Sequence, residues 1–168
     1  MKHAAKQTAL LGLCTALALL MAYVELLIPP IVAAVPGVKI GLPNVIIVFI
    51  LYRIGAKQAT VVSLVRVALV TLLFGNAMAF AYSIAGAALS LLVMIGLRKL
   101  KLFSAVGVSV AGAVMHNVGQ VLTAMLLLGT AELGYYLIVL SLTGTLAGVL
   151  IGICGALLIQ KIPDTKKY

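Results

Sequence analysis

Long apolar runs, separated by short polar breaks, fill almost the whole of this 168-residue chain. A helix of about twenty apolar residues crosses a hydrocarbon core of about 30 Å, so runs of that length are candidate membrane spans. We expect transmembrane helices over residues 8–28, 40–54, 58–74, 77–97, 104–128 and 135–159. The apolar part of the second run begins only at Leu42, so that helix is too short to cross as a straight helix unless it borrows residues 38–41 from the preceding loop or starts below the outer surface. The pattern predicts an all-α, six-helix bundle forming one transmembrane domain over residues 1–168.

Composition indicates that lipid, and not water, surrounds this bundle. Hydrophobic residues make up 64% of the chain, and charged residues only 9%. A water-soluble domain of this size could not hide that much apolar surface, because even compact domains expose a large part of theirs. We therefore expect a multi-pass protein of the cell membrane.

The basic residues predict the orientation of the helices. If both termini are cytoplasmic, ten of the twelve lysines and arginines lie on the cytoplasmic side, as the positive-inside rule favours. These ten are Lys2, Lys6, Arg53, Lys57, Arg98, Lys99, Lys101, Lys161, Lys166 and Lys167. Only Lys39 then falls in an outer loop, and only Arg66 within a span. The net charge of +9 thus reflects topology, and no basic patch with interleaved aromatic residues indicates nucleic-acid binding.

The first outer loop contains the turn-forming residues that are typical of an ordered segment. Residues 29–41 contain two adjacent prolines, a Pro-Gly turn and the closing Gly41. Pro43 then fits the first turn of the second helix, where its missing N–H costs nothing.

Small residues recur at helical spacing on the first and sixth helices. Gly144, Gly148 and Gly152 stand four residues apart, and such rows let helix backbones approach closely in lipid, so we expect packing within the chain. The first helix carries similar pairs at Ala5 and Ala9 and at Gly12 and Ala16. Because these pairs are the nearest to the cytoplasm, they could pack against a partner protein instead.

Two charged residues within the spans are candidates for function, because an unsatisfied polar group in lipid costs several kcal/mol. Glu25 lies close to the outer end of the first helix, where its carboxylate either reaches water or pairs with Arg66 or Lys39. Arg66 lies halfway along the third helix, too deep to reach the interface easily. An ion pair with Glu25 and contact with a substrate are equally open. Asn44, at the start of the second helix, is a further candidate.

The segment His116-Asn117-Val118-Gly119-Gln120 is the second polar feature. His116 and Gln120 are four residues apart and share one helical face, with Asn117 about 100° to the side. This face must be turned toward another helix or a wet pocket. A hydrogen-bond network between helices and a substrate-binding surface are both possible. The fourth helix offers a complement in Ser83, Gly86 and Ser90, and Gly119 indicates that a neighbouring helix or a ligand approaches closely.

Catalytic and metal-binding chemistry find little support. The chain has no paired carboxylates, no aspartate-rich motif for a magnesium diphosphate, no Walker loop and no CxxC motif. Cys14 and Cys154 have no neighbouring ligands at metal-binding spacing, so we expect both to be small packing residues. We expect no enzyme activity, no metal and no cofactor bound by this chain, and favour ligand binding.

Several segments together resemble the Gx transporter family, which is often labelled heptaprenyl diphosphate synthase component I. They are ELLIPP at 25–30, PGVKIGLPN at 36–44, Arg66, FG at 74–75, SIAG at 83–86 and HNVGQ at 116–120. The likeness covers nearly the whole chain, and the PGxKxG and HNxGQ motifs are fairly specific. Pro43 is a departure, because a small residue such as alanine is expected there.

The resemblance implies a substrate-binding S component of an energy-coupling factor (ECF) transporter. Such a protein captures a vitamin-like molecule near the outer face and works with a transmembrane T component and two cytoplasmic ATPases, which use the ATP. On this interpretation the first helix docks on the partner through Ala5, Ala9, Gly12 and Ala16. Glu25, Lys39, Asn44, Arg66, His116, Asn117 and Gln120 would line or brace the substrate cavity. Flavin, vitamin, quinone precursor and isoprenoid all stay open as substrates.

Two alternatives remain. The family label implies a noncatalytic membrane subunit associated with a separate heptaprenyl diphosphate synthase, since this chain has a single aspartate, Asp164. The other alternative is a proton-coupled carrier that works alone, in which Glu25 and His116 titrate.

Overall fold

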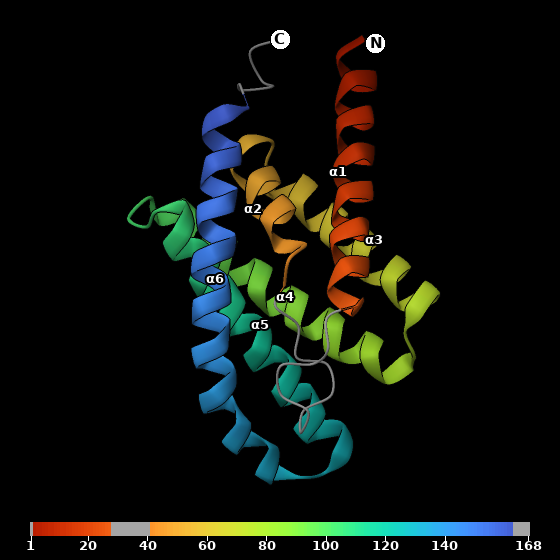
Figure 1. Ribbon diagram of the computed structural model, residues 1–168, viewed down its shortest axis with the longest axis vertical. Helices are drawn as coiled ribbons and strands as arrows, with labels where there is room; N and C mark the ends of the chain where they lie inside the picture. Colours follow the sequence, from red (N-terminus) through yellow and green to blue (C-terminus); the bar gives the residue numbers. More distant parts are fainter. Residues whose placement is uncertain (1, 28–40, 163–168) are drawn as a thin grey trace.

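The computed structural model describes residues 2–27 and 41–162, which are entirely helical apart from short connections (Figure 1). Its elements are α1 (Lys2–Leu27), α2 (Asn44–Arg53), α3 (Ala56–Phe74), α4 (Ala77–Leu100), α5 (Ala105–Leu128), the short 3-10 helix η1 (Ala131–Tyr135) and α6 (Tyr136–Lys161). All six predicted helices are thus present in the described residues. Lys39 and most of the predicted outer loop lie outside these ranges.

Five of these helices are long and apolar enough to cross a membrane, which makes this a multi-pass membrane protein. The exception is α2, which has ten residues and begins at Asn44 rather than at residue 40 as predicted. At 1.5 Å per residue it spans about 15 Å, roughly half the hydrocarbon core. The predicted extension is wrong at residues 41–43, because Gly41 has φ +84° and the backbone turns at Leu42 and Pro43; residue 40 lies outside the described ranges.

The short helix α2 forms the centre of the bundle. All seven residues from Val45 to Leu51 are buried, which fits a helix that is apolar on every side. Its C-terminal end is held by two arginines. Arg53 donates a hydrogen bond through Nη2 to the carbonyl of Ile159 on α6, and Arg98 of α4 donates to the Tyr52 carbonyl at 3.3 Å while lying 5.4 Å from the Tyr52 ring centre. The ends of α2, α4 and α6 that carry basic residues therefore meet on one side of the bundle.

Glycines bring α5 close to both of its neighbours. A Cβ atom on Gly148 or Gly152 of α6 would lie 2.7 Å from the Cα of Val110 or Val106 on α5. On the opposite side, a Cβ on Gly119 would lie 2.9 Å from the Cα of Gly86 on α4. These distances confirm that the glycine row of α6 packs within the chain and that Gly119 marks a close helix approach.

Helix α1 stands at the edge of the bundle and has two different faces (Figure 1). Cys14, Ala18, Ala22 and Glu25 are buried against the rest of the protein. The opposite face carries the four small residues predicted to dock on a partner, Ala5, Ala9, Gly12 and Ala16, and all four are exposed. Cys14 packs as expected, but Cys154 is exposed on α6, so its predicted role as a packing residue is wrong.

Candidate functional site

A cavity of about 220 Å³ opens between α1, α3, α4 and α5, beside the start of α2. It lies at the C-terminal ends of α1 and α3 and the N-terminal end of α4, and so away from the Arg53 and Arg98 contacts. The described residues that line it are Ala22, Glu25, Leu26, Gly41, Asn44, Arg66, Val67, Val70, Thr71, Phe74, Gly75, Asn76, Ala79, Ser83, His116 and Gln120. Five of the seven predicted site residues are among them.

Glu25 links α1 to the start of α2 at one end of this cavity. Its side chain is only 7% exposed, and one carboxylate oxygen accepts a hydrogen bond from the backbone N–H of Gly41. Gly41 itself has φ +84°, a conformation that residues with a Cβ rarely adopt. The interpretation of Glu25 as a carboxylate that simply reaches water is therefore wrong.

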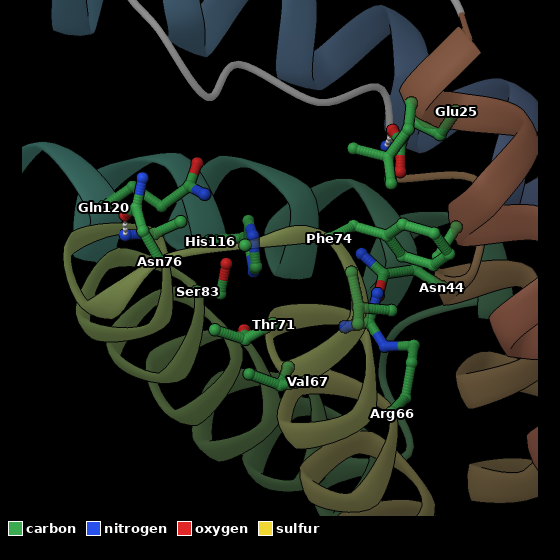
Figure 2. Close-up of a pocket in the computed structure, with 16 residues that line it drawn as sticks. Glu25, Asn44, Arg66, Val67, Thr71, Phe74, Asn76, Ser83, His116 and Gln120 are labelled. Atoms are coloured by element: carbon green, nitrogen blue, oxygen red, sulfur yellow. Dashed lines mark hydrogen bonds between the residues drawn. The ribbon is translucent and has the colours of Figure 1, made fainter.

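Arg66 lies on α3 at the same end of the cavity. Figure 2 shows its side chain rising from the helix toward Asn44. Its guanidinium interacts electrostatically with Glu25, but its buried Nε has no hydrogen-bond partner among the described residues. A buried donor without a partner costs about 1–3 kcal/mol, and more on a charged group. Arg66 thus lines the cavity with a guanidinium that is not fully hydrogen-bonded.

Amides, hydroxyls and an imidazole occupy the rest of the cavity. His116 and Ser83 lie between the Arg66 end and an opposite end formed by Asn76 and Gln120 (Figure 2). The close α4–α5 crossing places them, since a Cβ on Gly86 would lie 2.9 Å from the His116 carbonyl oxygen and 3.0 Å from the His116 ring. The predicted face of His116 and Gln120 thus meets both another helix and a pocket, and Ser83 and Gly86 are its complement as expected.

Asn117 is turned away from the cavity. Its Nδ2 donates a hydrogen bond of 2.7 Å to the Leu140 carbonyl on α6, and the side chain is 5% exposed. The amide fits against Gly144, where a Cβ would lie 2.6 Å from the same nitrogen. Asn117 therefore joins two helices, and the polar segment of α5 divides into a cavity side and a packing side.

Sequence reasoning did not single out Thr71 and Asn76, which also line the cavity. Thr71 is a single hydroxyl in an apolar run, one turn beyond Val67. Asn76 has the signature of an ordinary helix cap, because its side chain accepts the Ala79 N–H at 2.9 Å. This cap leaves the Asn76 amide NH₂ as a donor at the cavity. The adjacent Phe74-Gly75 pair, which is part of the family resemblance, was the one sequence feature that pointed to this part of the chain.

The arrangement suits binding better than covalent chemistry. Among the described residues that line the cavity, the carboxylate is that of Glu25 and the guanidinium that of Arg66, and the other polar groups are amides, hydroxyls and an imidazole. Within the described residues no group of three His, Cys, Asp or Glu side chains could hold a metal ion. Such a mixture of apolar wall and a few polar groups is typical of small-molecule sites.

The model of a family described as heptaprenyl diphosphate synthase component I matches residues 14–158, which include every described residue of the cavity. No curated protein and no solved structure matches the chain.

Proposed function

We propose, from the premise that this chain belongs to the heptaprenyl diphosphate synthase component I family, that it is the substrate-binding component of an ECF-type transporter. In this proposal it captures a small molecule in the cavity between α1, α3, α4 and α5 and delivers it with the help of partner subunits. Those partners are a transmembrane T component and two cytoplasmic ATPases, which supply the energy. The chain itself binds no ATP and carries out no reaction.

The observation that carries the proposal is the polar cavity in an otherwise apolar bundle. Burying Glu25, Arg66, His116 and Gln120 among lipid-facing helices is costly, and intramembrane ionisable groups are retained mainly where they act on substrates or ions. The cavity lies at the end of the bundle opposite the cluster of basic helix ends. With the basic ends in the cytoplasm of a cell membrane, it would open toward the outside.

The exposed face of α1 supports a partner in the membrane. Ala5, Ala9, Gly12 and Ala16 are exposed, and a Cβ added to Gly12 would meet nothing within 4 Å. A stripe of small residues lets a second helix approach closely, which is the usual basis of association between transmembrane helices. The stripe lies on the opposite side of α1 from Cys14, Ala18 and Glu25, so a partner could dock without covering the cavity lining.

Copurification from the native membrane tests the proposal. The tagged protein is solubilised in a mild detergent, and the proteins retained with it are identified by mass spectrometry. Recovery of a T component together with ATPases is the expected result. Recovery of a prenyl diphosphate synthase alone would exclude the transporter and support a noncatalytic membrane subunit, which the family name favours.

A proton-coupled carrier working alone is distinguished by reconstitution. Liposomes that contain only this chain should show no uptake of the small molecules that copurify with it. Uptake driven by a pH gradient without ATP would replace the ECF proposal, and Glu25 and His116 would then be the groups to substitute.

A further inference from the structure

We infer that the ligand of this cavity is a small organic monocarboxylate whose carboxylate binds Arg66 and whose other end is uncharged and forms hydrogen bonds. The inference rests on the proposed binding function and specifies its substrate class. It follows from the partners of Arg66, the distribution of charge in the cavity, and the cavity volume.

Arg66 supplies the binding group for the carboxylate. Its Nε–H is buried without a hydrogen-bond partner in the described part of the chain. The guanidinium is a planar fork that pairs with a carboxylate through two parallel hydrogen bonds. The two terminal nitrogens of the fork would each donate to one oxygen of a ligand carboxylate, whereas the Nε–H is enclosed by protein atoms. A neutral carbonyl would supply only one acceptor and no charge.

The charges around Arg66 favour a single negative charge on the ligand. Arg66 is the one cation among the described residues that line the cavity, and Glu25 already interacts with it electrostatically. A phosphate or diphosphate would bring two or more negative charges toward one guanidinium and a nearby carboxylate. Like charges in a poorly solvated site repel strongly, so a monoanion fits better.

The opposite end of the cavity selects an uncharged polar group. Asn76 and Gln120 lie there, with Ser83 and His116 between them and Arg66 (Figure 2). The side-chain oxygen of Asn76 is used by its helix cap, so its amide NH₂ is the group that can bind a ligand. Amides and hydroxyls orient ring edges, hydroxyl groups and carbonyls through hydrogen bonds.

The volume limits the size of the ligand. A cavity of about 220 Å³ is smaller than the range of about 300–1,000 Å³ that holds drug-sized ligands. A heptaprenyl chain, with its seven isoprene units, is far larger, so a compact acid with one ring or a short chain is the better fit.

Three flat molecules of nearly equal shape test which ligand charge the cavity prefers. The melting temperature of the purified protein is measured in detergent with benzoate, benzamide or benzamidine, which are anionic, neutral and cationic, and with farnesyl diphosphate. Benzoate should raise the melting temperature by roughly 3 °C or more at saturation, and the other three should have little effect. The benzoate shift should disappear in Arg66→Gln and persist in Lys99→Gln, which removes an exposed cation at the far end of α4.

Each other result has a defined meaning. An equal or larger shift with benzamide, benzamidine or farnesyl diphosphate overturns the monocarboxylate, and so does the absence of any shift with benzoate. If Arg66→Gln does not fold, the comparison of the four compounds on the unaltered protein still shows whether the cavity prefers a monocarboxylate. Small molecules released from the native protein by denaturation are identified by mass spectrometry. A released compound without a carboxylate overturns only this inference, whereas the release of none contradicts the proposed binding function itself.

Discussion

The two halves of this bundle are built on different principles. The C-terminal half, α4 to α6, is joined by close backbone contacts at glycines such as Gly119, Gly148 and Gly152. In the N-terminal half, α1 meets the bundle through fewer contacts, among them the Tyr23–Phe74 ring contact at 5.5 Å and the Glu25–Gly41 hydrogen bond. The cavity lies where the two halves meet, with Arg66 contributed by one and His116 by the other.

The two halves therefore differ in how firmly they hold the residues that line the cavity. The tightly packed half fixes the positions of His116 and Gln120, so that the neutral wall of the cavity is preorganised. The loosely held helix α1 contributes Glu25 to the same cavity and exposes its small-residue face. In the proposed function, ligand binding and partner docking would therefore both involve α1.

The largest effect should come from filling the glycine contacts between α5 and α6. The double substitution Gly148→Ala and Gly152→Ala places each Cβ 2.7 Å from a backbone Cα, which cannot move aside as a side chain could. We expect a loss of stability of about 2–4 kcal/mol or more, measured by thermal unfolding in detergent. Gly96→Ala on α4 is the matched control, because nothing lies within 4 Å of its Cβ, and it should be neutral or slightly stabilising. Equal stability of the two variants would remove the distinction between the halves.

Removing the hydrogen bond between Asn117 and Leu140 should have an intermediate effect. Asn117→Ala deletes one buried donor and should lower the stability by about 1 kcal/mol, in line with hydrogen bonds between membrane helices. The variant should still retain its copurified small molecule, because Asn117 is turned toward α6. Loss of the bound molecule with unchanged unfolding would show instead that Asn117 acts in the cavity.

Gln120→Ala is the complementary change on the same helix. Gln120 lines the cavity, so its loss should change the stability by less than about 0.5 kcal/mol. The amount of small molecule released from the purified protein should fall several-fold, because one polar contact at the uncharged end is removed. Together, Asn117→Ala and Gln120→Ala separate the packing side of α5 from its cavity side.

The smallest effect on stability should come from the exposed face of α1. Ala9→Leu with Gly12→Leu adds bulk where the structure has no neighbour, so unfolding and bound small molecule should be unchanged. Copurification of the T component and ATPases should nevertheless be lost, since the close approach of a second helix is blocked. Gly96→Leu, on another exposed helix face, should leave copurification intact. Loss of partners in Gly96→Leu as well would contradict a specific role for α1.

The helical pattern could be predicted well because lipid imposes it. Hydrophobic length alone located five long helices to within a few residues at most ends, although α1 begins six residues earlier than the predicted span. It was least informative at α2, whose apolar run is too short to cross as a straight helix and whose ten residues lie largely buried among the other helices. Hydropathy cannot distinguish a short helix surrounded by helices from part of a longer one surrounded by lipid.

The sequence by itself determined that Arg66, Glu25 and His116 lie in an apolar bundle, because a membrane leaves few polar residues to choose from. Only the tertiary structure decided which of them share a cavity. Asn117 is adjacent to His116 in the chain, yet it bonds to α6, whereas Asn76 is forty residues from His116 and lines the same cavity. The physical reason is that the side chains of adjacent residues on a helix point about 100° apart. The glycine contacts determine which helix packs against each side of α5, and so what each side chain contacts.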